Sequence, residues 1–452
     1  MSLITAEAAV YALTIIFLPL LLMVFLKIDI VKTSAVVLLF SILAAVKLGF
    51  LDELPWFIAS GLWTGLQIAS IVVAALLFYN VYRALGYEDK LKRSFGREYS
   101  EKMKLPLSVF FAGFIESTSG FGITVAVAAP MVAMLGTEAL TALVACLIGH
   151  SWAVPYASLG IPTLVLSSLT STDSFKLSQV TGILLSPSLF MTVLVVSRIL
   201  KFSRRELLIS LMLTVFLPII AYLVGPLTGL IASLLIFLTY ITVVLRKRVR
   251  NIIESLKPYI ALTIVLILAN LSGMKGLFSV SSCIVLLAIV YSLFNNRSVL
   301  IQVSKKTIKA SYKPAMAIIF FTIVADISRQ SGMMEALAEE VAGLAGGYFL
   351  YAIPIMGIIG TYITGSNTAS NIIFAALYES YAKITGLDPY LVLALQNSGG
   401  GLGSMIAPSK IAVGASTLES EGLEGLALRE TIKYIVPVAA PLMLIALVST
   451  FT

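Results

Sequence analysis

The chain has 452 residues, of which 59% are hydrophobic and 12% are charged, and its formal net charge is +8. Ordinary soluble domains carry about 25% charged residues, so this composition excludes a soluble globular protein. The only two cysteines, Cys146 and Cys283, both lie in apolar stretches and give no disulfide framework or metal cluster. The positive charge is concentrated in short segments, which argues against a nucleic-acid-binding surface.

Long apolar blocks begin near the N-terminus and recur along the chain. Residues 11–26, 34–46 and 207–245 contain no Lys, Arg, Asp or Glu. Because about 20 apolar residues in a helix cross the hydrocarbon core, we expect an all-α integral membrane protein with about 12–14 transmembrane segments. Some of these segments are interrupted, which predicts broken or re-entrant helical hairpins. The first block lacks a basic flank and a small-residue cleavage site, so we expect a span and not a removable signal.

Most of the Lys and Arg residues lie in four short segments between the apolar blocks. These segments are residues 86–104, 198–205, 246–257 and 297–313. Basic residues are enriched in the cytoplasmic loops of membrane proteins. The pattern therefore predicts a multi-pass plasma-membrane protein with these four loops in the cytoplasm, where they would also attract anionic lipid.

The two halves of the chain share a weak internal repeat at a shift of 246 residues. Residues 80–86 (NVYRALG) match residues 326–332 (DISRQSG) in a polar residue, an Arg and a Gly, and Pro162 matches Pro408. With one gap, three further pairs align: Gly113 with Gly360, Ser117 with Thr364, and Ser119 with Ser366. The shared offset indicates one structural unit used twice.

The loop charges are opposite in the two copies of this unit. Residues 86–104 are basic, but their counterpart, 332–350, has no Lys or Arg. Residues 297–313 are basic, but their counterpart, 51–67, again has none. The two copies of the unit are therefore expected to have opposite orientations in the membrane, as in the inverted-topology repeats of secondary transporters.

The repeat divides the chain into two transmembrane units. The N-terminal unit is residues 1–205 and contains a hairpin motif at 113–122. The C-terminal unit is residues 206–452 and contains a hairpin motif at 360–371. Two inverted halves can each adopt the conformation of the other, which would give inward-open and outward-open states that are related by symmetry.

Four polar stretches, 113–122, 160–162, 360–371 and 396–410, interrupt otherwise apolar spans. Such breaks survive in a membrane where they line a cavity, and the half-helices that follow them offer free N–H groups to an anion. The alternative is that their small residues allow close helix packing. The residues expected to bind a substrate are Ser117, Thr118, Ser119, Gly120, Gly122, Ser366, Asn367, Thr368, Asn371, Asn397, Ser409 and Lys410.

Motifs for other chemistry are missing from the sequence. The glycines 399–401 are not part of a GxxxxGK[ST] frame, which argues against nucleotide binding. There is no HExxH motif and no pair of metal-binding cysteines, so we expect no cofactor and no catalytic residues. The expected partners are a small carboxylate, a coupling ion, membrane lipid and, as one possible assembly, a second copy of the chain.

Several of these motifs resemble the lactate permease family, and the resemblance covers most of the chain. The match is strongest at 360–371 (GTYITGSNTASN), and it continues at 386–389, 396–400 and 407–409. In the first half the matching residues are Ile115-Glu116, Gly120-Phe121-Gly122 and Gly160-Ile161-Pro162. The resemblance implies proton-coupled uptake of L-lactate, glycolate or a similar acid. The chain differs from the family at 117–119, 149–152 and 408–410.

A proton symporter needs a titratable group at membrane depth, and such groups are rare there. Glu116 is the first candidate, with a structural carboxylate as the alternative, and Asp326 is the second, with a local ion pair to Arg329 as the alternative. The single histidine, His150, is a third, because histidine changes charge near neutral pH. Lys410 would either offset a bound carboxylate or extend toward an interface.

Three rival functions stay open on the sequence alone, and one of them is a channel, which saturable, gradient-driven accumulation would exclude. A sodium-coupled symporter of carboxylates or other organic anions would use the same broken helices. A membrane-embedded lipid-modifying enzyme would need clustered acidic metal ligands or a nucleophile with a base, whereas the acidic residues here are scattered.

Overall fold

The structure is a computed structural model that describes residues 3–94, 101–120, 122–244, 250–272, 277–295, 297–418 and 422–450. Within these ranges the chain forms helices joined by turns, with no strand. Eleven helical stretches of the described chain are long and apolar enough to cross a membrane. The prediction of an all-α membrane protein is therefore confirmed. Phe121 of the first break and parts of two basic segments (95–100 and 246–249) lie outside the described residues.

The helices of the N-terminal half are separated mainly by short turns. In chain order they are α1 (Leu3–Leu20), α2 (Ile30–Lys47), α3 (Leu54–Ala84), α4 (Tyr87–Ser94), α5 (Lys104–Pro106), α6 (Ala112–Ser119), α7 (Ile123–Met134), α8 (Ala139–Gly149), α9 (Ala157–Leu169) and α10 (Ser174–Ile199). A 3₁₀ segment, Ser151–Tyr156, joins α8 to α9.

The C-terminal half continues in the same manner. Its helices are α11 (Arg204–Leu213), α12 (Phe216–Val224), α13 (Thr228–Val244), α14 (Arg250–Leu271), α15 (Leu277–Asn295), α16 (Arg297–Gln330), α17 (Met333–Ala345), α18 (Phe349–Thr364), α19 (Asn367–Thr385), α20 (Pro389–Gly403), α21 (Pro408–Ala415) and α22 (Leu423–Val448). A 3₁₀ segment, Ser404–Ile406, joins α20 to α21.

The long helices α3 and α16 pack against each other in antiparallel orientation. Near one end, a Cβ placed on Gly61 would lie 2.6 Å from the Ile323 Cα, so glycine is what allows the close approach. Toward the other end, the Asn80 Nδ2 donates to the Thr307 Oγ1 at 2.9 Å. These two helices are counterparts at the 246-residue shift, and their opposite directions are what an inverted repeat requires. The inverted repeat itself stays a prediction.

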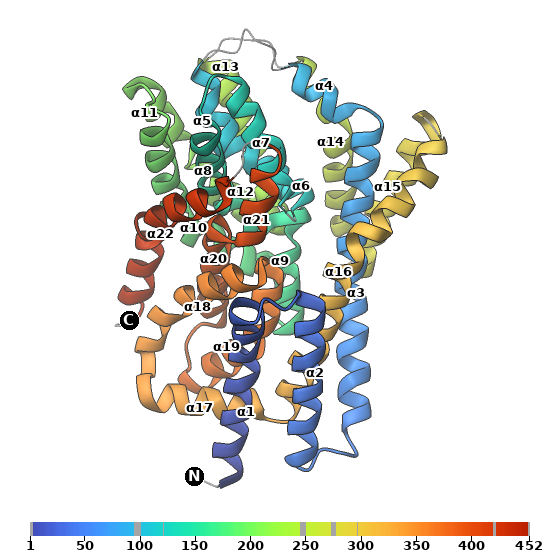
Figure 1. Cartoon of the computed structure of the whole chain (residues 1–452), viewed down its shortest axis with the longest axis vertical. Helices are drawn as coiled ribbons and strands as arrows, with labels where there is room; N and C mark the ends of the chain where they lie inside the picture. Colours follow the sequence, from blue (N-terminus) through green and yellow to red (C-terminus); the bar gives the residue numbers. More distant parts are fainter. Residues whose placement is uncertain are drawn as a thin grey trace.

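Each half contains one helical hairpin of the expected kind. In Figure 1, α6 and α7 lie in the upper half of the molecule and α18 and α19 in the lower half. The first hairpin turns at Gly120 and Gly122, which have φ of 57° and 81°, and the second turns at Gly365, with φ of 70°. Glycine suits these turns because other residues rarely adopt positive φ. The Ser366 side chain then caps α19 by accepting a hydrogen bond from the Ala369 N–H.

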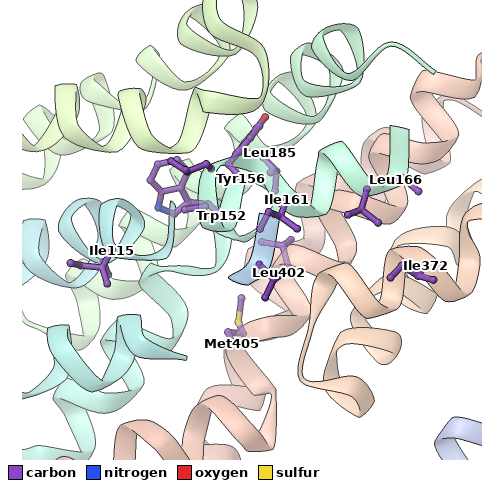
Figure 2. Close-up of a cluster of buried hydrophobic side chains, with 14 of the residues drawn as sticks. Ile115, Trp152, Tyr156, Ile161, Leu166, Leu185, Ile372, Leu402 and Met405 are labelled. Atoms are coloured by element: carbon purple, nitrogen blue, oxygen red, sulfur yellow. The ribbon is translucent and has the colours of Figure 1, made fainter. Parts of the chain in front are cut away.

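The two halves share one apolar core around the hairpins. Figure 2 shows its largest side chains, Trp152 and Tyr156, between residues of α6, α9, α10, α19 and α20. Trp152 is fully buried, and its ring occupies the space that a Cβ on Gly113 would need, 2.5 Å away. The hairpins are therefore seated on tightly packed helices and not on loose loops.

The described parts of the first three basic segments lie near one another at one end of the molecule. Lys90 forms an ion pair with Glu254 at 3.2 Å, and Lys102 forms one with Glu206 at 3.5 Å. Figure 1 shows α4 and the start of α14 together at this upper end, away from the turn that joins α2 to α3. Basic segments gathered at one end are what the positive-inside pattern predicts.

Candidate functional site

A small cavity lies where the four predicted breaks meet. Its volume is about 40 Å³. Its walls come from both halves of the chain: Glu116, Gly120, Val154, Ala157, Ser158, Ile161, Pro162, Gly365, Ser366, Asn367, Thr368 and Lys410. Stretches that are up to about 290 residues apart in sequence therefore line one space.

Each hairpin tip rests against a broken segment that follows it in the chain. The Ser158 Oγ donates to the Ser119 carbonyl at 3.0 Å, and a Cβ on Gly120 would lie 2.6 Å from that hydroxyl. In the second half, a Cβ on Gly365 would lie 2.3 Å from the Ser409 Oγ. The first tip is thus held by a hydrogen bond from Ser158, and the second tip lies close to Ser409; glycine allows both close approaches.

The start of α9 has an unusual backbone. Ser158, Leu159 and Gly160 have φ of 47°, 66° and 90°, so three consecutive residues are left-handed. Such a conformation costs about 1–3 kcal/mol for each non-glycine residue and is concentrated at functional sites. Gly160 is also sterically required, because a Cβ there would lie 2.5 Å from the Pro226 carbonyl oxygen. The turn directs Ser158 toward the first hairpin tip.

A buried ion pair forms one wall of the cavity. The Lys410 Nζ lies 2.9 Å from the Glu116 Oε1, and the two side chains are only 6% and 1% exposed. The Thr124 hydroxyl donates to the other carboxylate oxygen, Oε2. Removing two charges from water is costly, so such a pair persists only when each charge has close partners.

His150 completes the charged cluster. Its Nδ1 lies 2.9 Å from the Cys146 carbonyl, which can only accept, so Nδ1 carries the ring proton. Its Nε2 is therefore the acceptor, and it lies 3.3 Å from both the Lys410 Nζ and the Ser404 Oγ. The lysine ammonium is thus held between a carboxylate and a neutral imidazole.

A network of side-chain amides supports the second tip. The Asn367 Nδ2 donates to Asn397 at 3.2 Å (carbonyl) and 3.1 Å (Oδ1), and the Asn371 Nδ2 donates to the Asn397 Oδ1 at 2.9 Å. The network crosses between the halves, because the Asn371 Nδ2 also donates to the Pro162 carbonyl and the Asn397 Nδ2 donates to the Thr163 Oγ1. These asparagines tie the tip of α19 to the broken segment of the first half.

Other predicted site residues lie beside the cavity without lining it. Ser117 bonds to the Gly113 carbonyl, and Thr118 and Ser119 bond to the Ile115 carbonyl, within α6. Gly122 lies next to Lys410, since a Cβ there would be 3.8 Å from the lysine Cα.

Asp326 is placed differently from Glu116 and His150. It bonds to the Arg329 Nη2 and the Gln330 Nε2, each at 2.9 Å, on α16. It is not among the cavity residues. The structure therefore brings Glu116, His150 and Lys410 together and leaves Asp326 in a local ion pair.

Several residues of the cluster carried no signal in the sequence. Thr124, Ser158, Thr163 and Ser404 are ordinary hydroxyl residues in helical segments, and only their contacts identify them. The described residues contain no group of three or more His, Cys, Asp or Glu side chains placed to hold a metal ion.

A second cavity lies on the other side of the second hairpin, against α1. Its walls are almost wholly apolar and include Phe17, Ile363 and Phe374. It offers no charged group to an anion, so the polar cavity is the better candidate for a carboxylate.

Similar proteins of known name cover most of the chain. An L-lactate permease from Halalkalibacterium halodurans is 26% identical over 439 residues, which is 83% of this chain and 83% of that protein. An L-lactate permease from Escherichia coli is 26% identical over 460 residues, which is 83% and 82% of the two chains. The glycolate permease GlcA of Escherichia coli is 24% identical over 486 residues, or 86% and 85%.

Two solved structures share the fold. MtrF of Neisseria gonorrhoeae, from a class of antimetabolite efflux pumps, superposes with a TM-score of 0.55 at 15% identity, over 93% of this chain and 94% of its own. The YdaH transporter of Alcanivorax borkumensis has a TM-score of 0.51 at 14% identity, over 89% of each chain. At these identities the likeness concerns the fold alone. The sequence profile of the L-lactate permease family matches residues 8–253 and 275–451. The chain therefore belongs to the L-lactate permease family.

Proposed function

We propose that this protein imports L-lactate, glycolate or a similar small monocarboxylate across the plasma membrane by proton symport. The family and the names of its relatives support a carboxylate as the substrate. The observation that carries the coupling proposal is the buried pair of Glu116 and Lys410 in the wall of the cavity.

The carboxylate of the substrate would bind between Lys410 and the start of α19. Lys410 supplies the positive charge, and Gly365 to Thr368 place the first turn of α19 at the cavity. The first N–H groups of a helix have no partner within it, and they carry about half a positive charge together. Both groups favour an anion in a space from which bulk water is largely excluded.

Coupling follows from competition for Lys410. While Glu116 is ionised, its carboxylate pairs with the Lys410 ammonium at 2.9 Å, so no unpaired positive charge is left for the substrate carboxylate. When a proton neutralises Glu116, the ammonium loses its counter-ion and the substrate carboxylate replaces it. Proton and substrate therefore bind together.

The same charge balance suppresses uncoupled movement. The empty site holds one carboxylate and one ammonium, and the loaded site holds a protonated Glu116, the ammonium and the substrate carboxylate. Both states are neutral overall. A site with only the proton or only the substrate would contain an unpaired buried charge, which costs about 3–5 kcal/mol.

His150 would keep the ammonium in place during this exchange. Its Nε2 accepts from Lys410 whether or not Glu116 is ionised, because the Cys146 carbonyl holds the ring proton on Nδ1. We propose that the two hairpins then carry the site across the membrane, with the four basic segments facing the cytoplasm.

The test is uptake of radiolabelled L-lactate into vesicles that contain the purified protein. We expect accumulation when the outside is acidic, with or without sodium, and none at equal pH. Accumulation that follows a sodium gradient and ignores the pH gradient would replace the proposal by the sodium-coupled alternative. Comparing Glu116→Gln with Asp326→Asn then locates the proton: only the first is expected to abolish acid-driven accumulation.

A further inference from the structure

The polar side chains of the cavity wall differ in whether they are already occupied. Glu116 and Lys410 bond to each other, and the Ser158 hydroxyl donates to the Ser119 carbonyl. The Ser366 hydroxyl accepts from the Ala369 N–H. These interactions hold the tips and the ion pair in place, so the groups that make them have an internal role.

The amide nitrogen of Asn367 is occupied as well, whereas its Oδ1 is buried without a hydrogen-bond partner. Its Nδ2 donates to Asn397, and its Oδ1 points toward α20, since a Cβ on Gly400 would lie 2.0 Å from that oxygen. The Asn367 side chain therefore turns away from the cavity and supports the tip from behind.

Thr368 is the exception among the hydroxyl groups of the cavity wall. It lines the cavity, and its hydroxyl has no hydrogen-bond partner within the described part of the chain. The residue keeps 8% of its surface accessible, so the hydroxyl is not sealed off as the Thr361 hydroxyl is. A polar group at membrane depth without a partner is costly, unless a ligand or water satisfies it.

The cavity also has an apolar part. Val154, from the 3₁₀ segment before α9, and Ala157 and Ile161, from the start of α9, contribute to the wall. A bound 2-hydroxy acid presents a carboxylate, a hydroxyl and a small apolar group. Lys410, Thr368 and this apolar wall offer one complementary surface for each.

We infer that the Thr368 hydroxyl binds the 2-hydroxyl group of the substrate and so selects 2-hydroxy acids over the corresponding plain acids. The inference rests on the proposed function, because it assumes that a carboxylate binds at Lys410. Thr368 acts here as a specificity residue: it can donate to the substrate hydroxyl or accept from it.

The expected effect is moderate and selective. A neutral hydrogen bond that replaces bonds to water changes affinity by roughly tenfold or less. Thr368→Val keeps the shape of the side chain and removes the hydroxyl. It should weaken L-lactate about tenfold and leave propionate, which lacks the 2-hydroxyl, unchanged.

The test is inhibition of labelled L-lactate uptake by unlabelled L-lactate and by propionate in proteoliposomes. Wild type and Thr368→Ser should prefer L-lactate, and Thr368→Val should lose most of that preference. Thr361→Val is the matched control: it removes another unpartnered hydroxyl of the same hairpin, outside the cavity wall, and should keep the preference. Ligand-induced thermal shifts on the purified variants give the same ratio if transport is slow.

The outcomes separate this inference from the function on which it rests. Thr368→Val with an unchanged ratio of L-lactate to propionate would overturn the inference, and so would an equal loss in Thr361→Val. Wild-type protein that takes up and binds neither acid would remove the proposed function, and the inference with it.

Discussion

At the scale of single residues, the candidate site depends on one cluster of buried titratable side chains. Glu116, Lys410 and His150 come from α6, α21 and the end of α8, and all three are buried. Because each charge depends on the others, the cluster should respond to substitutions as a unit and not as independent parts.

Removing one partner of the ion pair should be worse than removing both. Lys410→Met leaves the Glu116 carboxylate unpaired, which costs about 3–5 kcal/mol if it stays ionised. We expect a lower melting temperature in detergent and no lactate uptake. The double variant Glu116→Gln with Lys410→Met should recover most of the melting temperature without uptake. A double variant that is less stable than the single one would contradict this account of the pair.

At the scale of elements, the hairpins depend on glycines. Replacing such a glycine can cost stability in two ways, through a strained left-handed backbone and through a clash of the new methyl group. Gly365 and Gly386 are the left-handed residues that end α18 and α19, with φ of 70° and 71°. A Cβ on Gly365 would meet the Ser409 Oγ at 2.3 Å, whereas a Cβ on Gly386 would meet nothing within 4 Å. Both positions therefore require a left-handed backbone, but only at Gly365 would a new methyl group meet a neighbouring side chain.

Substituting alanine at each position separates these costs. Both variants should lose about 1 kcal/mol from the left-handed backbone alone. Only Gly365→Ala should also lose lactate uptake, because its methyl group forces the hairpin tip away from Ser409. Thermal melting and vesicle uptake measured on both variants check this. Equal uptake by the two variants would show that the contact with Ser409 is not needed.

The elements also show what the sequence could and could not predict. The four breaks were recognisable because Gly, Pro, Ser and Asn interrupt apolar spans. The left-handed turn at Ser158 and Leu159 was not, since neither residue type favours positive φ and only the surrounding packing imposes it. Likewise, Glu116 and Lys410 stood out singly as charges at membrane depth. Their pairing could not be predicted, because it depends on the tertiary structure that brings together residues 294 positions apart in the sequence.

At the scale of the whole molecule, the proposal requires a definite orientation. Lys201 lies in a basic segment, and Asp52 lies in the turn between α2 and α3, at the opposite end; both are exposed. We expect a cysteine at position 201 to be shielded from an impermeant maleimide in intact cells, and a cysteine at position 52 to react. Protein without added cysteines serves as the control. The reverse labelling would invert the assigned topology.

The inverted repeat is likewise a whole-molecule prediction. It rests on the shift of 246 residues, the opposite loop charges and the antiparallel α3 and α16. Its functional meaning is that the two hairpin tips move together relative to a scaffold that contains α3 and α16. The sequence could suggest this symmetry because loop charge records orientation, and its polar breaks led us to expect the tips of both halves at one site. It could not give the side-chain contacts that hold the tips there.

The exchange of Glu116 for a substrate carboxylate at Lys410 is tested most directly by counting protons. Proton and L-lactate fluxes are measured together in vesicles with an internal pH dye, in wild type and in Glu116→Gln. We predict one proton per lactate in wild type, at a rate insensitive to an imposed membrane potential. The Glu116→Gln variant should exchange lactate for lactate with no proton flux. Unchanged proton-coupled accumulation in Glu116→Gln would contradict the mechanism.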